Sequence, residues 1–313
     1  MVLESLVSLK QGIRNPWSAF YLSAIVSLIS FSISFVVFKE DVGLYSVILT
    51  TLGLTPFMTK LNIYEGKISL VRKNGGILDL LFFYAKDKKS ITKMALIVLI
   101  PFLLFSLFYQ KMEFMLLMLF LYFGVFLLFS LVFLSFYREI ISCFIAVFAG
   151  ITLVFSLLYL ILPPEISSKT FRTQIDEIRA IRGYFWFGGT FQTIFINNVG
   201  VLFLSFLFSF IYGSGAIFIL AWNASILATA ASMLAQSLGG ITKLPIALLS
   251  YMPHGSLEIV AYFLAAVAGG ILSYYFTKGI RSKVVIEDCL FLLSLGMIFL
   301  LLGATVETAA LMS

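Results

Sequence analysis

Long apolar runs separated by short polar segments dominate the chain. They fall at about 17–38, 42–58, 94–109, 114–136, 140–162, 199–212, 216–236, 252–277 and 285–304. Most approach the roughly 20 residues that a helix needs to cross a bilayer core. None alternates apolar and polar positions as a barrel strand does. Because backbone groups in lipid must pair within the chain, the pattern predicts an all-α, polytopic transmembrane helical bundle of about nine spans.

The segments between these runs suggest elements that do not span. Residues 3–14 have the pattern of a short interfacial helix that ends at Asn15-Pro16, and residues 171–195 that of an outer interfacial helix. Residues 238–253 are expected to form a loop or a re-entrant segment. We therefore divide the chain into an N-terminal interfacial helix (1–16), an N-terminal bundle (17–162) with a basic cytoplasmic loop (59–93), an outer amphipathic connector (163–196) and a C-terminal transmembrane core (197–313).

Composition and charge agree with a membrane protein. Hydrophobic residues make up 61% of the 313 residues and charged residues 12%, whereas soluble domains carry about 25% charge. The basic residues lie between the apolar runs, which indicates the positive-inside rule rather than nucleic-acid binding. With the N-terminus inside, 14 of the 21 basic residues fall in cytoplasmic segments. We therefore expect a multi-pass protein of the cell membrane with a cytoplasmic N-terminus and an outer C-terminus.

Small residues mark two predicted helix-packing ridges in the C-terminal part. One ridge consists of Ala261, Ala265, Gly269 and Ser273, and the other of Ala224, Ala228 and Ser232. Spacing of i, i+4 places each set on one helix face, where small side chains let two helices approach closely in lipid. The ridges predict tight packing of these two helices against each other or against a second subunit, so a homodimer is one expectation.

Five polar residues are predicted to meet near the outer membrane surface: His254, Glu258, Glu307, Asn197 and Asn198. His254 and Glu258 are four residues apart and share a helix face. Glu258 and Glu307 are equally far from the turn near residue 282, so an antiparallel hairpin places them at one depth. Ionisable groups within spans are costly, and all of them should therefore face protein rather than lipid.

Several roles fit this polar cluster. It could be a structural clamp, a divalent-cation site, a proton or cation relay, or a site for a headgroup or peptide. One histidine and two carboxylates are fewer ligands than a zinc site usually has. Asn223 stands alone in its span, where a helix-to-helix hydrogen bond is expected. The chain has no P-loop, dinucleotide-binding glycine pattern, nucleophile elbow or HExxH motif, so ATP-driven and soluble-type hydrolytic activities are not expected.

Residues of about 190–308 resemble the stage II sporulation protein M (SpoIIM-like) membrane family. The resemblance rests on Ile196-Asn197-Asn198, Gly213-Ser214-Gly215, Asn223, Pro253-His254-Gly255-x-x-Glu258, Gly269-Gly270 and Ala304-x-x-Glu307. The preceding segment LPPEISSKTFRTQIDEI is similar to an extension of archaeal members. The resemblance implies an α-helical core with a shared polar site and a role in the cell envelope. It does not carry the spore-forming role of the family's namesake to this chain.

Together these features predict an integral membrane protein that organises or anchors a cell-envelope complex through its SpoIIM-like core. The expected partners are the lipid bilayer and other membrane or envelope proteins, and no nucleic acid. One alternative is a transporter or channel for an ion or lipid-like substrate that uses the His/Glu cluster. A second alternative is an intramembrane metal-dependent hydrolase.

Overall fold

Long apolar helices make up the computed structural model. The structure describes residues 15–71, 137–185, 190–213 and 215–312. Among these residues, seven helices have the length and hydropathy needed to cross a membrane. The predicted helical membrane bundle is therefore confirmed. The spans predicted at 94–109 and 114–136, like the interfacial helix at 3–14, lie outside the described residues, so the total of about nine stays a prediction.

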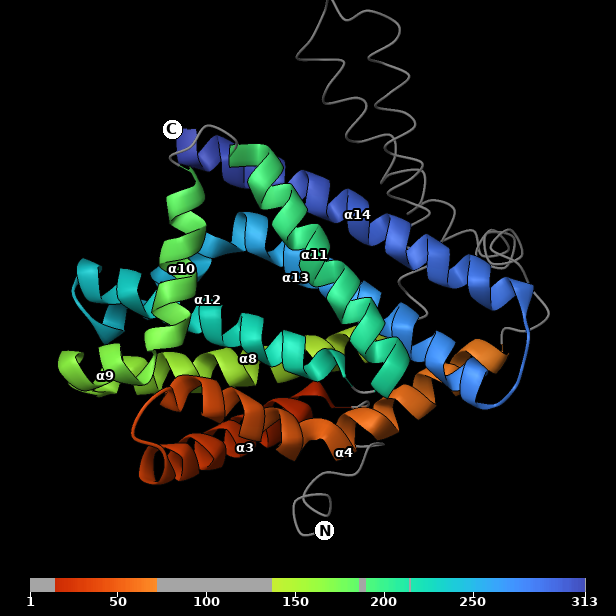
Figure 1. Ribbon diagram of the computed structural model, residues 1–313, viewed down its shortest axis with the longest axis horizontal. Coiled ribbons are helices and arrows are strands. Elements are labelled where there is room, and N and C mark those ends of the chain that lie inside the picture. Colours follow the sequence, from red (N-terminus) through yellow and green to blue (C-terminus); the bar gives the residue numbers. More distant parts are fainter. Residues whose placement is uncertain (1–14, 72–136, 186–189, 214, 313) are drawn as a thin grey trace, which may run out of the picture. The chain divides into compact units, whose positions relative to one another are not determined.

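The chain divides into two compact units. The first contains Met1–Ser69 and Glu139–Ser313, and the second Leu70–Arg138. Nearly all described residues belong to the first unit, whose helices are shown in Figure 1. In chain order the described helices are α3 (Pro16–Val37), α4 (Val42–Val71), α8 (Arg138–Ile161), α9 (Pro164–Thr170), α10 (Arg172–Phe185), α11 (Thr190–Tyr212), α12 (Ala216–Leu238), the short 3-10 helix η1 (Ile241–Lys243), α13 (Leu244–Thr277) and α14 (Lys283–Met312).

Local sequence signals explain several helix ends. Asn15 caps α3 by accepting a hydrogen bond from the Trp17 backbone N–H at 3.2 Å, and Pro16 occupies the first turn, where its missing N–H costs nothing. Gly239 ends α12 with φ of 119°, a left-handed conformation that glycine adopts without a side-chain clash. These two signals place the helix ends close to the boundaries of the apolar runs.

The helices differ from the predicted pattern in three segments. α4 continues to Val71, so residues 59–71 of the expected basic loop are helical. Residues 241–253 form η1 and the beginning of α13 instead of a loop or re-entrant segment. The interfacial helix α10 ends at Phe185, and α11 already begins at Thr190. A continuous helix satisfies its own backbone groups, which favours these longer helices where the chain enters lipid.

α13 lies at the centre of the C-terminal bundle. Residues 261–271 of this helix are all buried. They pack mainly against α11 and α14, and less extensively against α12. Pro253 lies inside α13, and Figure 1 shows the helix bending along its course. Because proline removes one backbone donor and crowds the preceding turn, it accounts for this bend.

The two small-residue ridges face different helices. A Cβ added to Gly269 would overlap the Phe206 carbonyl oxygen of α11 and lie 3.0 Å from the Phe210 nitrogen. At Gly269 the Ala261–Ser273 ridge therefore packs against α11. The sequence had suggested that this ridge contacts the other ridge helix or a second subunit. Which neighbour a ridge contacts depends on how the helix is rotated about its axis, and the spacing of small residues does not specify that rotation.

The second ridge packs against α8. Ser232 Oγ donates to the Ser156 carbonyl oxygen at 3.2 Å, and Ser156 Oγ donates to the Ala228 carbonyl oxygen at 3.4 Å. Ala224, Ala228 and Ser232 are fully buried. This reciprocal pair of hydrogen bonds joins the N-terminal helices to the C-terminal core, since α8 also packs closely on α3 at Gly150.

Candidate functional site

A polar cluster joins α11, α13 and α14, with Asn198 and Tyr262 buried and Glu258 and Glu307 half-buried. Asn198 Nδ2 donates to Glu258 Oε1 at 2.6 Å, and the Tyr262 hydroxyl donates to Asn198 Oδ1 at 2.8 Å. Asn198 is 7% exposed and Tyr262 3%. The Asn198 amide thus donates a hydrogen bond to Glu258 and accepts one from Tyr262, both on α13. It fixes the depth and the rotation of α11 against α13.

Glu307 completes the cluster from α14. Its side chain is half-buried and lies on the same face of α14 as Gly303, four residues earlier. The helices are close here, because a Cβ on Gly303, one turn before Glu307, would lie 3.2 Å from Glu258 Cγ. α13 and α14 therefore approach closely beside Glu258, which brings Glu307 to the edge of the cluster.

Tyr262 is a member of the cluster that the sequence reading missed. It follows Glu258 by four residues and His254 by eight, so all three lie on one face of α13. Its hydroxyl donates its single hydrogen to Asn198 Oδ1. Its i, i+4 spacing from Glu258 could have indicated that it belongs to the cluster. A tyrosine within a long apolar run, however, also fits an ordinary core position.

Two further residues of the predicted cluster, Asn197 and His254, have different surroundings. The Asn197 side chain is exposed, since the neighbouring position Asn198 takes the inward direction. His254 is half-buried, and its ring lies edge-to-face with Tyr251 at a centroid distance of 6.2 Å. In the described part of the chain no three His, Cys, Asp or Glu side chains come together as a metal site. The role of His254, Glu258 and Glu307 as a shared cation site stays a prediction.

Asn223 makes a local hydrogen bond. Its Nδ2 donates to the Ile219 carbonyl oxygen at 2.8 Å, one turn earlier in α12. The predicted hydrogen bond to another helix stays a prediction. A short amide side chain reaches the i−4 carbonyl of its own helix without help from tertiary packing.

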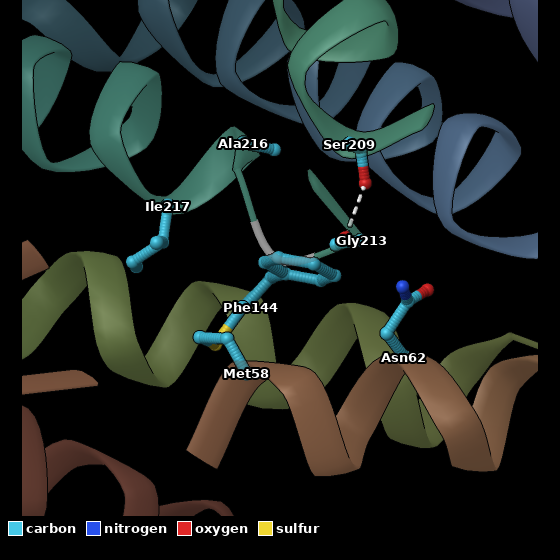
Figure 2. A pocket seen from close by; sticks show the side chains of 7 residues that line it. All are labelled: Met58, Asn62, Phe144, Ser209, Gly213, Ala216 and Ile217. Carbon is cyan, nitrogen blue, oxygen red and sulfur yellow. Dashed lines mark hydrogen bonds between the residues drawn. The ribbon is translucent and has the colours of Figure 1, made fainter. Parts of the chain in front are cut away.

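A second polar position borders a small cavity between α4, α8, α11 and α12. The cavity measures about 10 Å³ and is lined by Met58, Asn62, Phe144, Ser209, Gly213, Ala216 and Ile217. Figure 2 shows the Asn62 amide directed towards the turn that contains Gly213. Ser209 Oγ donates to the Gly213 and Ala266 carbonyl oxygens. Among the described residues Asn62 Oδ1 has no hydrogen-bond partner although the atom is buried.

Replacing Asn62 with leucine is expected to raise the melting temperature of the detergent-solubilised protein. Leaving a buried acceptor unpaired costs about 1–3 kcal/mol, and leucine removes that acceptor while filling a similar volume. Asn62→Asp is the matched control, because it keeps the shape and adds a charge that should lower the melting temperature. A lower melting temperature for Asn62→Leu would mean that the amide oxygen has a stabilising partner such as a water molecule.

Comparison with known proteins identifies a family. The family model described as "SpoIIM: Stage II sporulation protein M" matches residues 145–310, more than half of the chain. This region begins within α8 and contains α9 to α13 and most of α14, including the whole Asn198–Glu258–Tyr262–Glu307 cluster. No curated protein and no solved structure matches the chain.

Proposed function

Because the chain belongs to the stage II sporulation protein M family of membrane proteins, we propose that it anchors and organises a complex in the cell envelope. Its apolar helices make it a multi-pass membrane protein. The proposal assigns two tasks to different parts of the chain. The spans hold the protein in the bilayer, and a polar helix at the end of the bundle binds the partner.

The observation that carries this proposal is the charged face of α10. Phe171, just before the helix, and its residues Gln174, Ile175 and Ile178 are buried, at the i, i+3, i+4, i+7 spacing of an amphipathic helix. On the opposite face Arg172 and Arg179 each lie 3.6 Å from Asp176, and all three side chains are more than half exposed. Exposed ion pairs contribute little to stability, which leaves these charges available to a partner.

The buried face fixes α10 to the bundle. Thr173 Oγ1 donates to Asp41 Oδ1 at 3.0 Å, and Gln174 Nε2 donates to Ser225 Oγ at 3.4 Å. The Phe171 ring packs against Tyr159 with a centroid distance of 5.3 Å. A rigidly held charged surface loses little conformational entropy when a partner binds, and such preorganisation suits a docking surface.

The transport and metal-hydrolase alternatives gain no support from the described residues. Asn198, Glu258 and Tyr262 bond to one another, and the cavity near Asn62 has room for about one water molecule. These features fit the structural clamp that we weighed for the polar cluster. They agree with a protein whose core is built for rigid packing.

Reversing the charge of α10 tests the proposal. We expect the double substitution Arg172→Glu, Arg179→Glu to abolish photocross-links between a benzophenone residue placed at the exposed position 177 and its partner, while membrane yield and melting temperature stay unchanged. Lys278→Glu, Arg281→Glu in the exposed turn between α13 and α14 is the charge-matched control. Equal cross-linking in the wild type and the double variant would reject α10 as the docking surface.

We further propose that the protein is an archaeal-type member of the family in the cell membrane, with its N-terminus in the cytoplasm. The basic asymmetry between the two sides supports this orientation. A membrane-impermeant maleimide should label a cysteine at Lys243 in intact cells, and a cysteine at Arg281 only after lysis. Both native cysteines are buried and should not be labelled by the maleimide. Labelling of position 281 from outside would reverse the orientation.

A further inference from the structure

The outer face of α11 carries a polar residue where lipid would be expected. Asn197 is exposed and lies 15 residues before Tyr212 at the end of the span, which places it about 22 Å from that end at a rise of 1.5 Å per residue. This depth is inside a hydrocarbon core of about 30 Å. An amide that faces lipid can donate to the carbonyl one turn earlier, as Asn223 does, but its own helix offers no donor to its oxygen, so a polar partner on another helix would stabilise it.

The residues around Asn197 form a seam for a second helix. Asn197, Gly200, Leu204, Leu207 and Ile211 recur with alternating spacings of three and four residues, which is the a/d pattern of a helix pair. We call these five residues the α11 seam. Nothing lies within 4 Å of the position that a Gly200 Cβ would occupy. The opposite face, with Ile194, Asn198, Leu202, Ser205 and Ser209, is the one buried in the bundle.

We propose that the α11 seam binds the same seam of a second copy of this chain, forming a parallel, two-fold symmetric dimer. Copies inserted in one membrane with one orientation place their α11 helices parallel, so like positions meet across the axis. An asparagine amide is both donor and acceptor, and Asn197 is therefore complementary to itself. A single asparagine at an a position is a known device for fixing the register of a parallel helix pair.

Gly200 allows the two α11 helices to approach each other closely. Gly200 follows Asn197 by one helical turn and has no side chain, so the partner backbone can come near enough for the two amides to bond. Leu204 and Ile211 are 41% and 57% exposed and supply apolar contacts farther along the seam. The seam lies outside the α10 surface, and the dimer is independent of the proposed docking function.

Cysteine cross-linking in native membranes tests the dimer. We expect Asn197→Cys and Gly200→Cys to give disulfide-linked products of twice the chain mass after mild oxidation. Leu301→Cys is the control: Leu301 is 46% exposed in α14 and lies about 27 Å along its helix from Lys283, a similar depth. Cross-linking at position 197 no stronger than at position 301, or a product that joins position 197 to a different protein, would overturn the proposal.

The amide itself is tested by its removal. Asn197→Leu should lower the association constant of the dimer in detergent about five- to thirty-fold, which is the effect of losing an interhelical polar contact. Asn197→Gln should lower this constant less. The melting temperature of the monomeric fraction should stay the same, because this side chain faces away from the bundle. An unchanged dimerisation constant for Asn197→Leu would also overturn the proposal.

Discussion

Replacing Gly269 with alanine is expected to lower the free energy of unfolding by about 1–3 kcal/mol, the usual cost of overpacking a dense core. The added Cβ would overlap the Phe206 carbonyl oxygen and approach Ser209 Cβ to 2.9 Å and the Phe210 nitrogen to 3.0 Å. Two of these atoms belong to the α11 backbone, which can yield only by moving the whole helix. Gly269→Leu should have a larger effect, because its side chain has no space between the two helices.

Gly255 is the matched control for this substitution. It lies in the same helix, and nothing is within 4 Å of the position of its absent Cβ. Alanine stabilises a helix interior by up to about 1 kcal/mol relative to glycine, so Gly255→Ala should leave the melting temperature equal or higher. Both variants can be compared by thermal unfolding in the same detergent. Equal melting temperatures would show that α11 and α13 are less tightly packed than described.

Replacing Asn198 with leucine is expected to destabilise the protein by several kcal/mol. The substitution leaves the Glu258 carboxyl group and the Tyr262 hydroxyl without their partner, and each unpaired buried group costs about 1–3 kcal/mol, or more if it is charged. Tyr262→Phe should cost less, since only Asn198 Oδ1 then loses a partner. Glu258→Gln should have the smallest effect, because an amide can still accept the hydrogen bond from Asn198.

The neighbouring asparagine is the control for this series. Asn197→Leu makes the same chemical change one residue earlier, on the exposed face of α11. Its monomeric fraction should unfold at the wild-type temperature, whereas that of Asn198→Leu should unfold at a lower one. If both variants melted alike, the Asn198–Glu258 hydrogen bond would contribute little to stability. The series therefore separates buried polar pairing from the mere loss of an amide.

The sequence predicted what depends on depth along a helix, and it failed where rotation about a helix axis decides. The positions of the described spans followed from run length and helix rise. Run length and helix rise did not predict which of Asn197 and Asn198 points inward. The two adjacent side chains differ by 100° in direction, and both occur at the start of an apolar run. The inward position of Asn198 becomes evident only from its partners on α13.

Contacts between distant segments were also beyond the sequence. Asn62 lies outside the matched family region, yet it borders the cavity beside the Gly213 turn of that region. The α12 ridge packs on Ser156 of α8 rather than on α13. Small residues predict that a close contact exists but do not name the partner, since every nearby helix offers backbone atoms to approach.

The proline inside α13 has a consequence for how the protein fits membranes of different thickness. α13 has 34 residues, which is about 51 Å of straight helix against a hydrocarbon core of about 30 Å. A straight rod of this length would have to tilt strongly or thicken the surrounding lipid. A bent one can let the segment before Pro253 swing with the bilayer surface while the segment after it keeps its packing against α11 and α14. Changes in acyl-chain length should then be absorbed in the first turns of α13 and leave the Asn198–Glu258 contact undisturbed.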